Sequence, residues 1–390
     1  MCLLVKIKTK MVEIKTLKEN NSSFNYKKLF CIKDNVVIDI QQKNEMQEKY
    51  DPLKLFNFCS FLFGISISVR NQSRLVRVVH LILFIICSIN IALNSVDTLY
   101  FYKSASTILW LLRRIYFNSG AAFYCLFIHL FGNKIYQTIN NLIKNLTFDQ
   151  KKRIKLITTI GCVIIITERI AINAYGYILE VEKNGFSFKR LIFELFLLIR
   201  PNYIFHSFLV YTVFQMAFFY SCINLLNELE SCLNPSPKLI MKTVVEIYQN
   251  LNSLNMFAVI PFSILLPYLF IILPGCAQIK NKSVIYLLFI FTVMYCSCFI
   301  VAVVTATVFK RKLQTKRNQF IQTLFSKKEH MKFRSIEWTI CLDQLSNKNI
   351  FDFSVLSLFS IDFSLLMSVS SAVITFSILF FQLDSAHNSL

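Results

Sequence analysis

The chain has 390 residues, of which 55% are hydrophobic and only 16% are charged, and its formal net charge is +20. Soluble domains carry about 25% charged residues, because they need a polar exterior around their core. With a mean hydropathy of +0.52, the composition excludes a soluble enzyme, a secreted disulfide scaffold and a disordered chain. It indicates an all-α membrane protein with several spans. The basic residues lie between apolar blocks, which favours membrane orientation over nucleic-acid binding, so no nucleic-acid partner is expected.

Seven apolar segments have the length of about 20 residues that a membrane-spanning helix requires. They are 76–96, 115–131, 156–179, 204–226, 256–274, 284–309 and 359–383. A shorter apolar stretch, 56–69, fits an interfacial helix better than a span. Pro261 and Pro267 are expected to kink the fifth segment, because proline removes a hydrogen bond from the helix.

The distribution of lysine and arginine predicts the orientation of these spans. The segments 1–75, 132–155, 227–255 and 310–358 fall on one side of the membrane and hold 31 Lys and Arg residues, against nine on the other side. Basic loops stay in the cytoplasm, so we expect a cytoplasmic N-terminus and an extracellular C-terminus. This orientation argues against a rhodopsin-like receptor, whose N-terminus is outside. The sequence also lacks an Asp-Arg-Tyr motif after the third span and an Asn-Pro-x-x-Tyr motif in the seventh.

The last span carries a stripe of polar residues. Their spacings of 4, 4, 3, 4 and 7 positions place them on one face of a helix. They are Ser360, Ser364, Ser368, Ser371, Thr375 and Gln382. Such a face either packs as a seam of small residues against another helix or lines a water-filled pore. Gln382 favours the pore, because an amide within the membrane needs partners or water. Asp384 would form an acidic ring at the outer mouth if several copies met around an axis.

The C-terminal residues resemble the signature of the insect gustatory receptor family. Residues 375–383 read Thr-Phe-Ser-Ile-Leu-Phe-Phe-Gln-Leu, which is similar to the family's Thr-Tyr, five apolar residues and Gln-Phe. Gln-Leu at 344–345 and the segment 358–366 resemble the rest of that pattern, so the match covers roughly the last 45 residues. Phe376 replaces the family's Tyr, and Leu383 replaces its Phe.

The resemblance implies a ligand-gated, non-selective cation channel that assembles as a homo- or heterotetramer and detects tastants. It also implies a multi-pass protein in the plasma membrane of sensory neurons, with lipids as further partners. In that family the seventh helices line one central pore, so Gln382 and Leu383 are expected at its constriction. Thr375 and Phe376 are expected to hold the helix against its neighbours, and an apolar Leu383 ring can still gate the pore by dewetting.

Two further positions complete the expectations for the pore. Ser371 belongs to the same polar face, and Ser377 stands where the sugar-sensing branch of the family typically has Glu. The resemblance therefore favours a bitter or other non-sugar tastant.

The implied organisation has four parts: a cytoplasmic region at 1–75, a ligand-binding bundle of six spans at 76–309, a cytoplasmic anchor at 310–354, and a pore helix with a short tail at 355–390. Within the anchor, three apolar residues recur at helical spacing. They are Phe320, Leu324 and Phe325. They predict that the sixth helix continues inward with one apolar face. Either that face takes part in subunit assembly, or the segment is an amphipathic linker surrounded by solvent.

The outer halves of the first six spans are where the resemblance places the tastant. Arg169, Asn173 and Tyr177 share one face of the third span, at depths where a charge needs a partner, a cavity or the bundle interior. Further candidates lie in or beside the second and fourth spans. They are Trp110, Tyr203, His206 and Tyr211. Interfacial aromatic belts and ordinary packing account for the same residues, so both interpretations stay open.

No catalytic or metal-ligating spacing stands out in the sequence, so neither an enzyme activity nor a cofactor is expected. A metabotropic receptor that acts through a second messenger is the main alternative to a channel. A transporter is the third candidate, but the sequence shows no internal repeat and no proline-broken helices in matching halves.

Overall fold

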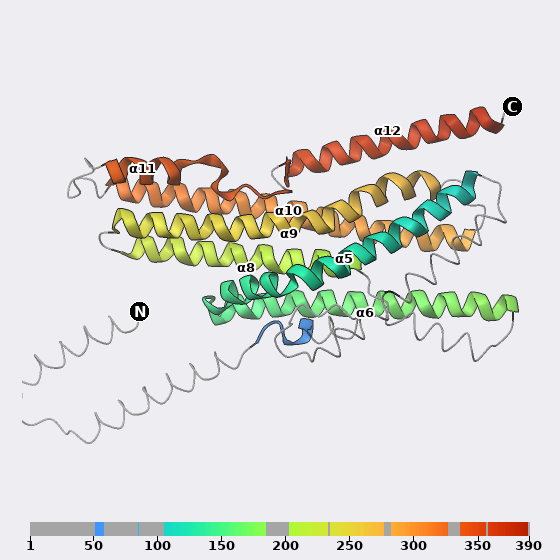
Figure 1. The fold of residues 1–390 in the computed structure, drawn as a ribbon, viewed down its shortest axis with the longest axis horizontal. Helices are drawn as coiled ribbons and strands as arrows, with labels where there is room; N and C mark the ends of the chain where they lie inside the picture. Colours follow the sequence, from blue (N-terminus) through green and yellow to red (C-terminus); the bar gives the residue numbers. More distant parts are fainter. Residues whose placement is uncertain are drawn as a thin grey trace, which may run out of the picture. The chain divides into compact units, whose positions relative to one another are not determined.

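The computed structural model describes residues 51–57, 85, 105–184, 203–232, 235–276, 282–326, 336–355 and 358–388. The chain divides into two compact units, 1–51 and 52–390, and the elements below all belong to the second unit. Within its described residues, this unit consists of helices and one two-stranded hairpin, in agreement with the expected all-α class (Figure 1). The first expected span, apart from residue 85, and most of the segment 56–69 lie outside the described residues.

Five of the expected spans lie within long helices. These are α5 (Ala105–Lys144), α6 (Phe148–Asn184), α8 (Tyr203–Ser231), α9 (Pro237–Cys276) and α10 (Lys282–Ser326). The continuation of the sixth helix beyond its apolar segment is confirmed, because α10 runs on to Ser326. Of the expected apolar face, Phe320 and Leu324 are buried, whereas Phe325 is 44% exposed. α9 continues as one helix through Pro261 and Pro267, so the two prolines do not end it.

The segment after α10 is only partly helical. It contains α11 (Ile336–Ser346), a 3-10 turn η3 (Lys348–Phe351) and a hairpin, in which β1 (Ser354–Val355) pairs antiparallel with β2 (Phe359–Ser360). The last helix, α12, runs from Phe363 to Asn388. The expected start of the seventh span at residue 359 is therefore wrong. A short apolar run cannot by periodicity alone be distinguished as strand or helix, and here residues 359–360 pair as a strand.

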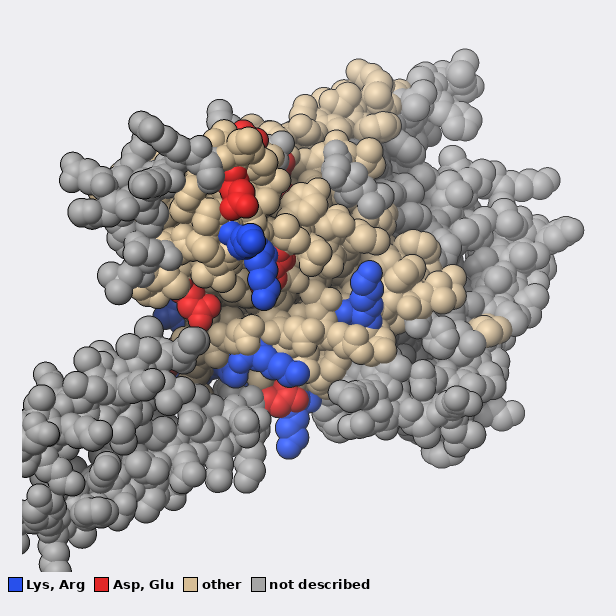
Figure 2. Space-filling view, turned by 60° about the vertical axis from the view of Figure 1, so that its left-hand side comes forward, with Lys and Arg blue, Asp and Glu red and all other residues tan. Residues whose placement is uncertain are grey.

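Charged residues are confined to the ends of four of these helices. The stretches 203–227 of α8, 247–276 of α9, 283–309 of α10 and 363–383 of α12 contain no Asp, Glu, Lys or Arg. Figure 2 shows the described charged residues gathered on the end of the bundle that faces the viewer. An uncharged apolar stretch of about 20 residues is long enough to cross a bilayer. By length and mean hydropathy, two helices of the described part qualify as spans, Ile204–Ser231 and Thr292–Ser326.

α8 occupies the centre of the bundle, where it packs against α5, α6, α9 and α10 (Figure 1). Nearly every side chain from Ile204 to Phe219 is buried, because α8 has neighbouring helices on all sides and is apolar almost all round. Phe262 of α9 meets the rings of Phe208, Tyr211 and Phe299 edge-on, each with ring centroids 5.8 Å apart. Edge-to-face pairs of this kind add to the stabilisation from burial.

Gly161 allows α6 to approach α8 closely. A Cβ atom added at Gly161 would overlap Cδ1 of Leu209 and lie 2.8 Å from its Cδ2 and 3.1 Å from its Cγ. Helices within membranes use small residues in this way, since close backbone approach maximises van der Waals contact.

We expect Gly161→Val to destabilise the protein by about 1–3 kcal/mol, because the added atoms overpack the contact with Leu209. Thermal unfolding of the detergent-purified protein measures the change. Gly132→Val is the matched control, since the Cβ there meets only Ile128 of the same helix, at 3.1 Å from its Cγ2. Equal melting temperatures for the two variants would contradict a tight contact between α6 and α8.

Candidate functional site

The candidate site is the face of α12 that the described helices of its own chain leave exposed. α12 packs against α9 and α10. Val369 is buried in this contact, and Leu365, Leu366 and Val373 are partly buried beside it. These residues recur at three- and four-residue intervals and form one face of the helix.

The polar stripe lies on the other side of the same helix. Successive residues of a helix are rotated by about 100° around its axis. By this rotation, the mean direction of the stripe differs from the direction of Val369 by well over a right angle. The stripe members on the helix are all exposed: Ser364, Ser368, Ser371, Thr375 and Gln382. The stripe is therefore not a seam against the described helices of its own chain. It faces either other copies or water.

Ser360 does not belong to the stripe, which corrects the sequence-based prediction. It lies in β2, and its hydroxyl donates to Oδ2 of Asp352 at 3.2 Å. The helix begins after Asp362, whose Oδ1 accepts hydrogen bonds from the backbone N of Ser364 at 2.9 Å and from its hydroxyl at 2.7 Å. A carboxylate in this position satisfies amide groups that have no partner in the first turn, which fixes where α12 starts.

The hydroxyls on α12 bond partly to their own backbone. Thr375 donates to the carbonyl of Ser371 at 2.9 Å, and Ser377, off the stripe, donates to the carbonyl of Val373 at 2.8 Å. Such bonds satisfy the donor but leave the hydroxyl oxygen able to accept a hydrogen bond. The residues therefore tolerate a membrane and still offer acceptors to water or a cation.

The expected pore residues are all on α12. Ser371, Thr375, Phe376 and Gln382 are exposed, with Phe376 at 52%. Leu383 and Asp384 also lie within α12, but their side chains are outside the described part of the structure.

Only two of the expected ligand residues have described side chains. His206 is buried, and its Nδ1 lies 2.6 Å from the hydroxyl of Tyr124 of α5, with the ring of Phe56 stacked on it at 5.3 Å between centroids. Tyr211 is fully buried and packs edge-on against Phe262. Among the described residues, the two side chains thus have different aromatic neighbours.

The other ligand candidates can be placed only by their helices. Arg169, Asn173 and Tyr177 lie in α6, Trp110 in α5, and Tyr203 is the first residue of α8. Their side chains are outside the described part, so their roles stay predictions.

Several polar residues buried in the fold were not predicted from the sequence. Gln215 of α8 is fully buried and donates from Nε2 to the carbonyl of Ala302 at 3.4 Å. Tyr124 is fully buried as the partner of His206. An amide or phenol within an otherwise apolar span was the available signal, because such groups need a partner there. Asp352 carried no comparable signal.

The charged end of the bundle is joined by polar contacts between helices. Lys316 of α10 lies 2.5 Å from Oε2 of Glu230 of α8, and Arg317 donates from Nη1 to the carbonyl of Asn347 at 2.8 Å. Burial lowers the pKa of Arg317, but an arginine remains protonated at any physiological pH. Burial also raises the pKa of the Cys341 thiol to about 11. Among the described residues, no group of three His, Cys, Asp or Glu could hold a metal ion.

Comparison with known proteins identifies the fold. No protein family model matches the sequence, and no curated protein matches it. The structure of the insect olfactory receptor OR5 from Machilis hrabei in complex with eugenol matches with a TM-score of 0.59 at 12% identity, over 85% of this chain and 98% of that one. A second structure of the same receptor gives a TM-score of 0.56 at the same identity and coverage. The chain therefore has the fold of an insect olfactory receptor.

Proposed function

We propose that the chain is a subunit of a ligand-gated, non-selective cation channel that detects non-sugar tastants. In this proposal it has seven spans and a cytoplasmic N-terminus. Four identical or related subunits assemble around a central axis that their α12 helices line, in the plasma membrane of sensory neurons. The observation that carries the proposal is the polar face of α12, which points away from the described helices of its own chain.

A physical argument connects this face to a pore. Hydroxyl and amide groups are costly to expose to hydrocarbon, yet they follow α12 from Ser364 to Gln382. One helix cannot enclose water, whereas several copies around an axis can, with their polar faces inward. The apolar sides of α12 would then pack between copies or meet lipid.

The proposed class of ligand is supported by a likeness in fold, and the proposed family by a likeness in sequence. The fold likeness is to a receptor solved with the small molecule eugenol, which supports a small-molecule ligand in the bundle of 76–309. The gustatory assignment rests on the resemblance at residues 375–383. Arg169, Asn173 and Tyr177 are the first ligand contacts to test, and the segment 310–354 is the proposed anchor between subunits.

Cysteine accessibility tests the pore directly. Ser370 and Ser371 are adjacent, chemically identical and both exposed, but only Ser371 lies on the polar face. We expect a positively charged methanethiosulfonate reagent at the cytoplasmic face of excised patches to block the current of Ser371→Cys by about tenfold, because four added charges in a pore repel cations. Ser370→Cys is expected to keep its current.

The wild-type channel is the control for reaction of the reagent at native cysteines, and its current must resist the reagent. Among the native cysteines, Cys341 is buried, and burial raises the pKa of its thiol to about 11, so little of it is in the reactive thiolate form at neutral pH. Currents are elicited with a panel of bitter compounds and with eugenol. Block of both variants, or of neither, would contradict the pore-facing stripe. A current that needs a soluble second messenger in the patch would support the metabotropic alternative.

A further inference from the structure

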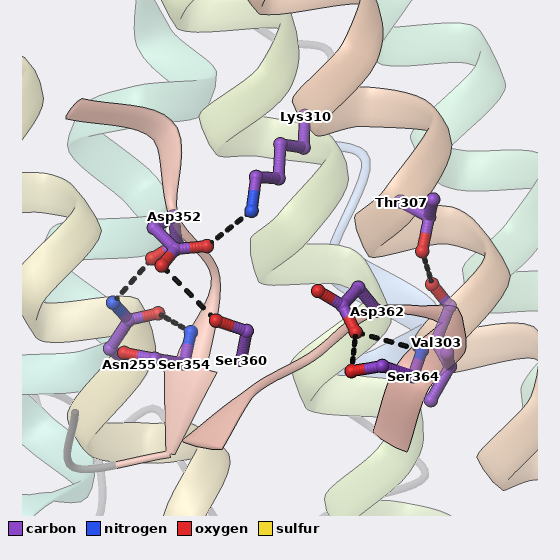
Figure 3. A network of polar contacts seen from close by, with 9 residues as sticks. All are labelled: Asn255, Val303, Thr307, Lys310, Asp352, Ser354, Ser360, Asp362 and Ser364. Atoms are coloured by element: carbon purple, nitrogen blue, oxygen red, sulfur yellow. Dashed lines mark hydrogen bonds and ion pairs between the residues drawn. The ribbon is translucent and has the colours of Figure 1, made fainter. Parts of the chain in front are cut away.

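The hairpin before α12 is held by one residue, Asp352, which contacts α9, α10 and β2 through its carboxylate and its backbone carbonyl. Oδ1 of Asp352 lies 2.5 Å from Nζ of Lys310 of α10, and its Oδ2 accepts a hydrogen bond from Ser360 of β2 at 3.2 Å (Figure 3). Asn255 of α9 donates from Nδ2 to the carbonyl of Asp352 at 3.0 Å, and its Oδ1 accepts from the backbone N of Ser354 at 3.0 Å. We call these five residues the Asp352 clamp.

The base of the hairpin is also seated in the core. Phe351, Phe353 and Ile361 are buried, and the backbone N of Ile361 donates to the carbonyl of Phe353 at 2.7 Å. The ring of Phe353 meets Phe218 of α8 edge-on, with centroids 5.9 Å apart. Because its side chains are packed and its polar groups are paired, this segment must follow any movement of the helices around it.

α12 itself is held much more weakly than the hairpin. Among its described side chains only Val369 is buried, and Met367 and Ile374 are 71% and 60% exposed. α12 packs against α9 and α10, which are the two helices joined by the clamp. The part of α12 that its own chain holds is therefore its first half, which directly follows the hairpin.

We propose that Asp352 is a positioning residue through which movement of α9 and α10 reaches the pore helix. The inference rests on the proposed channel function and adds the route from the bundle to the gate. When α9 and α10 shift together, the clamp carries the start of α12 with them. Without the clamp, α12 stays where its apolar contacts with neighbouring copies hold it.

The carboxylate can be disabled without dismantling the hairpin. Asn255 bonds to backbone atoms of residues 352 and 354, so Asp352→Asn keeps those two hydrogen bonds. It removes the charge and leaves one acceptor oxygen for Lys310 and Ser360, where the carboxylate has two. A single, partly exposed ion pair contributes little to stability, so the variant is expected to fold. Its effect should therefore appear in gating rather than in the amount of protein.

A matched control exists on the same helix. Lys316 and Glu230 also lie 2.5 Å apart, with side chains 22% and 31% exposed, against 23% and 27% for Lys310 and Asp352. That pair joins α10 to α8 instead of joining α10 to the hairpin. Lys316→Gln removes an equivalent ion pair without touching the clamp.

Single-channel recording tests the proposal in the full-length protein. We expect Asp352→Asn to lower the open probability about fivefold or more, a typical size for coupling between sites, with unitary conductance unchanged. Lys316→Gln is expected to keep the wild-type open probability. Lys310→Arg retains a cation opposite Asp352, so it is also expected to keep the wild-type open probability. A purely structural defect would change the number of channels instead of the open probability of each one.

The outcomes also separate this inference from the proposed function. An open probability of Asp352→Asn that equals that of the wild type, or a decrease shared with Lys316→Gln, would overturn the coupling role while the channel stands. A wild-type protein at the cell surface that passes no current with bitter compounds or eugenol would overturn the channel function, and the coupling role with it.

Discussion

Replacing Gln382 with lysine is expected to reduce the cation current about tenfold or more, because like charges around a narrow axis repel permeating cations at short range. Gln382 is exposed on the polar face of α12, near the end that we assign to the outside. In a tetramer the substitution would place four ammonium groups around one constriction. Each tenfold loss corresponds to about 1.4 kcal/mol of added barrier. Unitary conductance in symmetrical sodium solutions measures the effect.

Gln382→Glu is the matched counterpart, since it keeps the length of the side chain and reverses the added charge. It is expected to raise conductance and to favour divalent cations, because carboxylate rings attract cations. Surface biotinylation must show equal amounts of all variants. Equal conductance for the lysine, glutamate and wild-type channels would mean that Gln382 does not line the pore, and that the polar face serves assembly alone.

The sequence predicted the elements that depend on local pattern. The apolar segments within α5, α6, α8, α9 and α10 were found because a span needs a long uncharged run, and the charged flanks fixed where such runs end. The spacing of the polar residues from Ser364 to Gln382 predicted one face of α12 before its neighbours were known. Helical periodicity is a local property, so no long-range contact was needed to see it.

Contacts between distant parts of the chain could not be predicted in this way. Lys310 and Asp352 are 42 positions apart, and Asn255 and Asp352 are 97 apart. Their pairing depends on how α9, α10 and the hairpin pack, and each residue alone resembles an ordinary solvated polar group. The same limit applies to Ser360, whose spacing fitted the stripe although its segment pairs as a strand.

For His206, the sequence indicated that the side chain needs a partner but did not show which one. A histidine in the fourth span needs a partner, and the sequence offered a ligand or an interior contact. The structure provides Tyr124, which is 82 positions away, together with the ring of Phe56. A fully enclosed hydrogen bond of this kind supports packing of α5 against α8. A role in ligand binding would require these rings to separate.

Phe262→Ala is expected to destabilise the fold by about 3–5 kcal/mol, because it deletes a fully buried ring and leaves a cavity that the bundle cannot close. The ring of Phe262 touches Phe208, Tyr211 and Phe299, so one substitution weakens contacts among α8, α9 and α10. The melting temperature of the detergent-purified protein should fall sharply, and that of Phe262→Leu, which keeps most of the apolar volume, should fall much less.

Phe376→Ala is the matched comparison for Phe262→Ala, because it makes the same substitution at an exposed position. Both changes remove the same atoms, but Phe376 is 52% exposed on α12 within its own chain and Phe262 is fully buried. If α12 meets other copies, Phe376→Ala should lower the fraction of tetramer on size-exclusion chromatography while subunits keep their helical content. Phe262→Ala should instead lower the helical content and the yield of folded subunits. Equal loss of fold for both variants would mean that α12 is held by its own chain, and the oligomeric pore would lose its support.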